Sequence, residues 1–473
     1  MNREKDFVKN TIILGMGNLF PKIAVFITLP VLTLKLSKWE YGMYDLIMAG
    51  VSFLLPLITL QMQSAAFRFL IECRNDTLRT KQIISNIVTM VYTISFLTCF
   101  FVIAALGTYS WLLRVGIGTY FFSDMMYMTM GQIIRGMGYN RQYSIAALIL
   151  ACIQVFGILI MTGICQKGLL GIICVLALAN LLSAVYMSGY IKVWKMVCLR
   201  YISPLVTAEL IKYSFPMIFN NLAMWVLNLS DRVILNYFLG LEATAVYAVA
   251  NKIPGMISFA QSIMTMAWQE NASLAVTDKD AKDYFSRMFK NCFDILFVIT
   301  VLLFMLLPIL FCILIQGDYK EAYPNISILM LGMFFYVMSS FLGGIYVAHK
   351  KTKAVAGSAF LAAFLNLFLN ILLIENYGVT AATLSTLCAC MALYIGRAVK
   401  MKKIQKIDYH VIHQVQLVGI LIVMVIIGHQ LSMSRFVINL ILGMAAIWMQ
   451  RKTFAGIYIK IWRKGTRKNE NTQ

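Results

Sequence analysis

The sequence predicts an all-α polytopic membrane protein with about fourteen transmembrane helices, and three observations support this prediction. The 473-residue chain is 60% hydrophobic and only 13% charged, with a mean hydropathy of +0.77, whereas soluble proteins are about 45–50% apolar and about 25% charged. Apolar segments of membrane-spanning length recur along the whole chain, and basic residues concentrate in every second loop between them. This composition excludes soluble enzymes, nucleic-acid-binding proteins, fibrous proteins and disordered proteins.

The predicted helices follow from the length of the apolar segments. A transmembrane helix needs about 20 mostly apolar residues, and the first apolar stretch is too long for a signal peptide. Fourteen segments meet this requirement, and they lie near 10–35, 42–70, 83–106, 110–134, 143–165, 169–190, 213–240, 243–268, 291–316, 322–348, 354–373, 377–397, 412–430 and 436–450.

The distribution of basic residues supports an even number of spans. The chain has 41 Lys and Arg against 20 Asp and Glu. Loops on the side of both termini hold 31 of these cations, and the opposite loops hold five: Lys35, Lys38, Lys167, Lys320 and Arg435. Because cytoplasmic loops are enriched in Lys and Arg, both termini are predicted to be cytoplasmic.

A weak internal repeat predicts the domain organisation. Shifting residues 8–46 onto 211–249 aligns Asn18 with Asn221 and Tyr44 with Tyr247. Parallel repeats of this kind are known in transporters. The predicted parts are an N-terminal bundle (1–200, spans 1–6), a C-terminal bundle (201–411, spans 7–12), two further spans (412–450) and a basic cytoplasmic tail (451–473).

Polar residues within the spans predict a hydrated cavity between the two bundles. A charge at mid-span costs at least about 2.5–3.5 kcal/mol on insertion scales and usually faces the bundle interior or water. Polar stripes occur on spans 1, 2, 7 and 8, and Asp45 belongs to the stripe of span 2. The predicted substrate-binding residues are Lys22, Arg232, Lys252, Asn18, Asn221, Asn228, Trp225 and Asn251.

The positive bias of these residues favours an anionic substrate such as phosphate or pyrophosphate. Asp231 and Asp124 are candidate ion-coupling residues. Alternatives remain open, because Ser, Thr and Asn also join helices, Asp231 and Arg232 could form a structural ion pair, and Trp225 could pack in a core. No catalytic, nucleotide-binding or metal-binding motif is present, and the ten cysteines have no metal-ligand spacing. We therefore expect no cofactor, no metal, no nucleic-acid partner and no enzymatic activity.

Several segments resemble the polysaccharide transporter (Wzx-type oligosaccharide, or O-antigen, flippase) branch of the MATE-like MOP superfamily. They are YGMYDLI and QSAAFRFLIE in span 2, and the span 7–8 stretch that contains SDRVILNYFLG and VYAVANKIPGM. The resemblance covers spans 1–12. It implies two six-helix bundles in a MATE/MOP-like arrangement, here with two additional C-terminal helices.

The resemblance also implies a function. Such proteins move undecaprenyl-pyrophosphate-linked oligosaccharides from the inner to the outer leaflet of the bacterial cytoplasmic membrane, by alternating access through a cation-lined cavity, for O-antigen, capsule or exopolysaccharide synthesis. The implied partners are the lipid-linked oligosaccharide, membrane lipids, and polysaccharide polymerase or glycosyltransferase machinery. The alternatives are a MurJ-like lipid II flippase and a MATE-type drug/cation antiporter.

Overall fold

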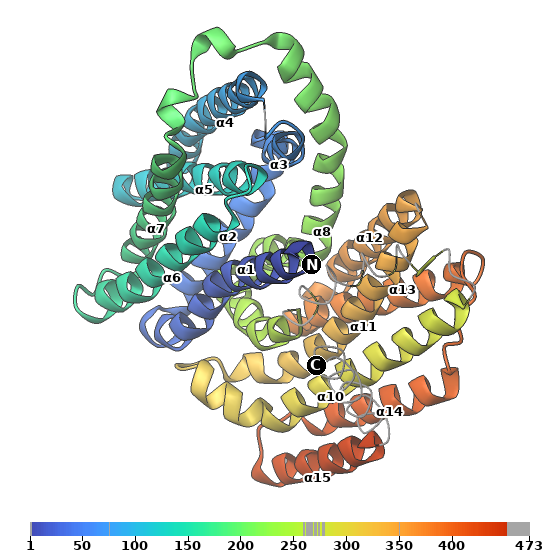
Figure 1. The fold of residues 1–473 in the computed structure, drawn as a ribbon. Coiled ribbons are helices and arrows are strands. Elements are labelled where there is room, and N and C mark those ends of the chain that lie inside the picture. The colour runs from blue at the N-terminus through green and yellow to red at the C-terminus, as the bar shows by residue number, and fades with distance from the viewer. Residues whose placement is uncertain are drawn as a thin grey trace, which may run out of the picture. The chain divides into compact units, whose positions relative to one another are not determined.

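The computed structural model describes residues 2–74, 76–258, 280–349 and 351–451, with isolated positions between 259 and 279. This part of the chain is helical throughout (Figure 1). Its main helices are α1 (Asn2–Lys35), α2 (Lys38–Ile58), α3 (Met62–Glu72), α4 (Thr77–Ala105), α5 (Trp111–Gly136), α6 (Asn140–Gly163), α7 (Gly168–Ile191), α8 (Pro204–Ala250), α10 (Ala281–Leu314), α11 (Tyr323–Ala348), α12 (Thr352–Tyr377), α13 (Val379–Met401), α14 (Val411–Ile427) and α15 (Met433–Met449).

The predicted all-helical membrane fold is confirmed. Within the described residues, nine helices are long and apolar enough to cross a membrane, and α14 and α15 are shorter apolar helices. The predicted spans 213–240 and 243–268 share α8, and the second of them lies partly outside the described residues. Gly240 separates the two parts of α8, because its backbone (φ 84, ψ −177) is not helical.

The predicted span over 42–70 is not one continuous helix. α2 ends at Ile58 and α3 begins at Met62, and both Leu60 (φ 48) and Gln61 (φ 54) have left-handed backbone conformations. The hydropathy of the segment did not reveal this break, because the polarity of side chains does not report the backbone torsions. The carboxamide of Gln61 accepts a hydrogen bond from the Ser64 hydroxyl at 2.9 Å, which satisfies one polar group at the break.

The chain groups into two compact units. The first unit contains residues 1–233 and 314–317, and the second contains 234–313 and 318–473. The Pro204–Val233 part of α8 therefore belongs to the first unit. The predicted division into sequence bundles at residue 200, and the roles assigned to 412–450 and 451–473, remain predictions.

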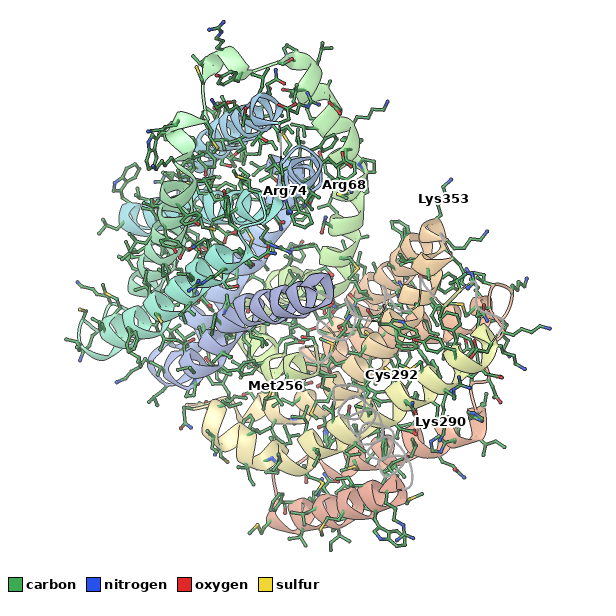
Figure 2. All side chains as sticks on the ribbon, viewed as in Figure 1. Arg68, Arg74, Met256, Lys290, Cys292 and Lys353 are labelled. Atoms are coloured by element: carbon green, nitrogen blue, oxygen red, sulfur yellow. The ribbon has the colours of Figure 1, made fainter. Side chains whose placement is uncertain are left out.

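The first unit is built around α5, α6 and α7. α1 packs against α6, while α7 packs against both α5 and α6 (Figure 1). α3 approaches α5 closely at Gly136, where an added Cβ would lie 2.9 Å from the Cβ of Leu70. The Arg74 guanidinium, beyond the end of α3, donates from Nε to the Gly136 carbonyl at 2.9 Å, and Figure 2 labels this side chain. These contacts fasten α3 to the end of α5.

The second unit has an aromatic core. Buried phenylalanines recur at helical spacing along α10, and they pack against α11, which is buried over most of its surface. Arg397 of α13 is 7% exposed and joins three helices. Its guanidinium donates to the Ser339 carbonyl of α11 at 2.8 Å and to the Ser358 hydroxyl of α12 at 2.9 Å. This buried charge is thus compensated by oxygen acceptors from its neighbours.

α14 contacts α10 through a histidine–carboxylate pair in the second unit. His413 Nε2 lies 2.9 Å from Asp294 Oδ1, and Lys290 Nζ lies 3.7 Å from Asp294 Oδ2. The Asp294 carboxylate is fully buried, whereas the Lys290 side chain, labelled in Figure 2, is 40% exposed.

Candidate functional site

A buried ion pair joins α2 to α8 in the first unit. Arg232 Nε donates to Asp45 Oδ2 at 2.5 Å, and the two side chains are only 10% and 6% exposed. Arg232 Nη1 also donates to the Asn228 carbonyl one turn earlier in α8, at 3.0 Å. A buried arginine requires such compensation, because an unpaired charge in a low-dielectric interior is very costly. The α2–α8 junction is therefore held by matched charges.

Trp225 extends this junction along both helices. Its indole Nε1–H donates to the Ala49 carbonyl at 2.9 Å, and its ring lies 4.7 Å from the Phe53 ring between centroids. Asp45, Ala49 and Phe53 are spaced by four residues on α2, so they share one face of that helix. Trp225 and Arg232 are spaced by seven residues on α8 and form the opposing face. Trp225 and Arg232 of the predicted span 7 stripe thus contact α2.

The predicted asparagines form local hydrogen bonds. Each amide Nδ2 of Asn221, Asn228 and Asn251 donates to the carbonyl four residues earlier in its own helix, at 3.0, 2.7 and 3.2 Å respectively. Asn228 is exposed, whereas Asn221 and Asn251 are half-buried. The side chain of Asn18 lies outside the described residues. Each described carboxamide keeps an oxygen acceptor that these bonds do not use.

The predicted cations Lys22 and Lys252 are both half-buried, and they belong to different units. Lys22 lies in the second half of α1, directly after Pro21, and Lys252 follows the end of α8. Asp231 is 1% exposed and precedes Arg232 in α8.

Asp124 lies in a second polar contact of the first unit. Its Oδ1 accepts a hydrogen bond from Asn180 Nδ2 at 3.2 Å, which joins α5 to α7. One helical turn earlier, the Tyr120 hydroxyl contacts the Met48 sulfur at 3.0 Å. Asp124 therefore has an amide partner within its own unit.

Sequence reasoning missed the two partners that define these contacts. Asp45 was recognised only as one member of a polar stripe, and Asn180 was not singled out. The sequence distance from Asp45 to Arg232 is 187 residues, so no local spacing could connect them. The available signal was that Asp45 and Arg232 both lie within predicted spans. A charged group inside the membrane needs a partner, so the two could have been paired with one another. Among the described residues, no group of three His, Cys, Asp or Glu side chains is placed to hold a metal ion.

Comparison with protein-family models gives two matches. The model described as "Polysaccharide biosynthesis protein" matches residues 7–269, which is more than half of the chain. The model described as "MatE" matches residues 216–372. A comparison with curated protein sequences gives no match.

Solved structures show the same fold at low sequence identity. The lipid II flippase MurJ, in an inward closed conformation, is 12% identical with a TM-score of 0.66, over 96% of this chain and 100% of that chain. An inward-facing multidrug resistance MATE family transporter of the MOP superfamily is 14% identical with a TM-score of 0.59, over 82% of this chain and 98% of that one. The outward-facing conformation of such a transporter is 10% identical with a TM-score of 0.57, over 84% and 94%.

The resemblance to the MATE-like superfamily and the expected fold are therefore confirmed. The sequence match covers the α2–α8 junction, and the structural matches cover nearly the full chain. This chain is a multi-pass membrane protein that belongs to the polysaccharide biosynthesis protein family of transporters, within the MATE/MOP superfamily.

Proposed function

We propose that this protein moves undecaprenyl-pyrophosphate-linked oligosaccharides from the inner to the outer leaflet of the bacterial cytoplasmic membrane, for surface polysaccharide synthesis. The observation that carries the proposal is the family match over residues 7–269. The fold shared with a lipid II flippase supports it, since that protein handles a lipid-linked cargo by its printed name. Polymerase and glycosyltransferase machinery would supply and consume this cargo.

The proposed orientation places both termini in the cytoplasm. The supporting observation is the excess of Lys and Arg in the loops on the side of the termini. In this orientation, the α1–α2, α4–α5 and α6–α7 connections face outward. An anionic head group then moves with the membrane potential, which favours its exit by about 2.3 kcal/mol per charge per 100 mV. Coupling to an ion is not required by this energy balance, and Asp124 and Asp231 remain the candidate coupling residues.

The physical requirement is to shield the head group of the cargo. Burial of an unpaired sugar hydroxyl or amide costs several kcal/mol, and burial of a charge costs far more. We infer that the bundles rock in alternating access while the prenyl chain stays in lipid. Lys22 and Lys252 are the proposed cationic contacts for pyrophosphate. We propose that the sugars are contacted by four side-chain amides and one aromatic ring. These belong to Asn18, Asn221, Asn228, Asn251 and Trp225.

Arg232 can bind the cargo only if the cargo displaces the carboxylate that already pairs with it. Because its guanidinium is paired with Asp45, cargo would have to compete with that carboxylate for it. The double variant Asp45→Asn/Arg232→Gln removes both charges without leaving either unpaired. Loss of transport by a stably folded double variant would support a cargo role for Arg232, whereas normal transport would assign the arginine to structure alone.

The experiment that tests the proposed function is a gene deletion with lipid analysis. We expect the deletion strain to accumulate a prenyl-linked oligosaccharide on the cytoplasmic side and to lose the surface polymer. The wild-type gene should restore both. Lys22→Gln should fail to restore them at matched membrane levels, while the control Lys320→Gln, an exposed residue between α10 and α11, should succeed.

The same lipid analysis separates the alternatives. Accumulation of lipid II would favour the MurJ-like role, for which the structural similarity is the specific observation. A change in drug susceptibility with no lipid-linked intermediate would favour a MATE-type antiporter. Either of these results would contradict the proposed cargo.

A further inference from the structure

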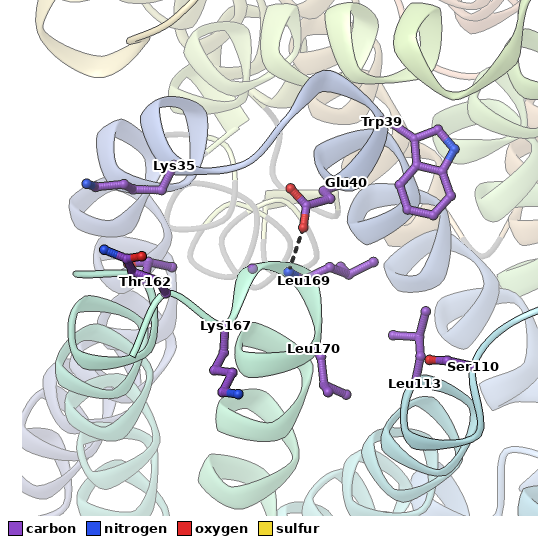
Figure 3. A pocket seen from close by; sticks show the side chains of 11 residues that line it. Lys35, Trp39, Glu40, Ser110, Leu113, Thr162, Lys167, Leu169 and Leu170 are labelled. Carbon is purple, nitrogen blue, oxygen red and sulfur yellow. Dashed lines mark hydrogen bonds between the residues drawn. The ribbon is translucent and has the colours of Figure 1, made fainter. Parts of the chain in front are cut away.

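Three connections of the first unit meet at one end and enclose a cavity of about 610 Å³. They are the α1–α2, α4–α5 and α6–α7 connections, and Figure 3 shows the side chains that line the cavity. The polar lining residues are Lys35, Trp39, Glu40, Ser110, Thr162, Gln166 and Lys167. This volume lies in the range of about 300–1,000 Å³ that is typical of small-molecule sites.

Glu40 builds the cavity wall rather than offering a free carboxylate. Its Oε1 accepts the backbone N–H of Leu169 at 3.2 Å, which joins the start of α2 to the start of α7 (Figure 3). Its Oε2 accepts the backbone N–H and the hydroxyl of Ser37 at 3.0 and 3.1 Å in a capping box. The negative charge is thus engaged by three donors, and these bonds fix the rim in place.

The remaining charges of the cavity are positive. Lys35 and Lys167 line it from the α1–α2 and α6–α7 connections, and both side chains are exposed. Within the described residues, neither ammonium group lies within ion-pair distance of a carboxylate. Trp39 adds an indole ring that is 43% exposed at the same rim. Two ammonium groups, an accessible aromatic ring and several hydrogen-bonding side chains suit an acidic, sugar-bearing head group.

A second, apolar groove is lined by α2, α4 and α5. The groove has a volume of about 380 Å³, and its lining includes Met43, Ile47, Gly50 and Leu54 of α2, with Phe101 of α4 and Ile117 of α5. Trp39, Met43 and Ile47 are spaced by four residues on α2, and Leu113, Ile117 and Phe121 are spaced likewise on α5. In each series the first residue lines the polar cavity and the next two line the groove. The polar and apolar sites therefore follow one another along one helix face.

The length of the groove matches one membrane leaflet. From Met43 to Leu54 it follows eleven residues of α2, which corresponds to roughly 16 Å at 1.5 Å per residue. Half of the hydrocarbon core of a bilayer is about 15 Å thick. Its floor is buried at Ile117 and Phe121, whereas Phe101 at its edge is 71% exposed. An apolar chain that lies in this groove would reach from the polar cavity to the bilayer midplane.

From this arrangement we propose that the first unit holds a prenyl-linked, anionic glycan lipid at its outer end. Lys35 and Lys167 bind the acidic group, Trp39 contacts a sugar ring, and the prenyl chain lies in the α2–α4–α5 groove. The inference rests on the proposed function for the identity of the cargo and for the orientation. It adds a docking site for the lipid that has already crossed the membrane. Cargo seated there is in the outer leaflet, where the next enzyme of polymer assembly can reach it.

Binding to the purified full-length protein tests this site with a defined probe. Native mass spectrometry would measure the apparent Kd for undecaprenyl pyrophosphate that carries one N-acetylhexosamine, with phosphatidylglycerol as the competitor. We expect Lys35→Gln/Lys167→Gln to weaken binding by about tenfold, which corresponds to about 1.4 kcal/mol for two partly exposed charge contacts. Lys320→Gln is the matched control and should stay within about twofold.

The groove is tested by filling it at Gly50. A Cβ at Gly50 would meet no atom within 4 Å, so a side chain can enter the groove without a backbone clash. Gly50→Phe should reduce binding of the prenyl probe by about tenfold or more, and Gly50→Leu serves if the larger residue lowers thermal stability. Gly357→Phe on α12 is the control, because a Cβ there also meets no atom within 4 Å.

Trp39 separates sugar recognition from general lipid binding. Trp39→Ala should weaken the sugar-bearing probe and leave sugar-free undecaprenyl pyrophosphate unchanged. Equal displacement of the probe by phosphatidylglycerol would overturn the inference and identify a site for ordinary phospholipids. Unchanged binding in both the lysine and the Gly50 variants would also overturn it.

The two proposals fail in different ways. Should the deletion strain accumulate a lipid-linked oligosaccharide while these variants bind and complement normally, the proposed function stands and the docking site does not. If no prenyl-linked intermediate accumulates in the deletion strain, the proposed function fails whatever lipid the purified protein binds.

Discussion

The ion pair between Asp45 and Arg232 allows a quantitative test of how the first unit is held together. Asp45→Asn leaves a guanidinium buried without its carboxylate, and Arg232→Gln leaves the carboxylate without its cation. Both side chains are at most 10% exposed, so water compensates little of the loss. Removal of one partner of a buried pair typically costs about 3–5 kcal/mol. We expect each single variant to lose stability in this range.

The double variant should be more stable than the sum of the single effects predicts. Asp45→Asn/Arg232→Gln replaces the ion pair with two neutral amides that can hydrogen-bond to one another, so neither charge of this pair is left without the other. We expect a coupling energy of about 2 kcal/mol or more, within the range of about 0.5–3 kcal/mol seen for residues in contact. The cycle would be measured as unfolding of purified protein in mixed micelles, with the midpoint and slope compared across the four proteins.

An exposed pair on the neighbouring helix provides the control. Arg68 and Glu72 of α3 lie 2.7 Å apart, but their side chains are 55% and 54% exposed. Such surface pairs contribute about 0–1 kcal/mol, so Arg68→Gln and Glu72→Gln should have small effects. Additive effects at Asp45 and Arg232, or single losses as small as those of the control pair, would refute the assignment of a buried, mutually compensating pair.

Three further predictions concern the second unit and α8. Arg397→Ala should lower the unfolding midpoint of the protein clearly more than Lys402→Ala does. It removes the donor to acceptors of α11 and α12, and each lost partner typically costs about 1–3 kcal/mol. Equal midpoints for the two variants would contradict this. Gly240→Ala should cost about 1–3 kcal/mol in the same assay through backbone strain alone, since φ is 84 and no atom lies within 4 Å of the added Cβ. Burial lowers the pKa of His349 in the folded protein. As the pH falls through about 6.5, the unfolded chain therefore takes up a proton at this residue while the folded chain does not. Thermal stability should decrease over this pH range. His349→Gln should flatten this pH dependence of the melting temperature, and an unchanged profile would count against it.

The fold was largely predictable because apolar length and loop charge are local properties of a sequence. The predicted spans in the described residues lie largely within helices, and the predicted division near Gly240 is also present, whereas the span over 42–70 is broken between Ile58 and Met62. The break at Leu60 and Gln61 was not predicted from hydropathy, since the polarity of side chains does not determine backbone torsions. Left-handed torsions at two consecutive non-glycine residues depend on the surrounding packing, which a single sequence does not contain.

The candidate site was predictable only in part. The polar stripe grouped Trp225 and Arg232 on one face of α8, because helical periodicity brings residues seven apart together, and the substrate-binding role assigned to that face stays a prediction. The partner of that face on α2 depends on tertiary contacts across 176 to 187 residues. The cavity at Lys35 and Lys167 had one overlooked signal: three of the five cations in the cation-poor loops belong to the α1–α2 and α6–α7 connections.

The interruption between α2 and α3 divides the predicted span over 42–70 into two helical segments. Across it, Met62 N–H donates to the Thr59 carbonyl and Ser64 N–H to the Gln61 carbonyl, so the regular i to i−4 hydrogen bonds of an α-helix are interrupted. Asp45 and Trp225 join α2 to α8, and Glu40 joins it to α7. Arg74 instead fastens the end of α3 to α5. Each segment is therefore positioned by its own neighbours rather than by one shared helix axis.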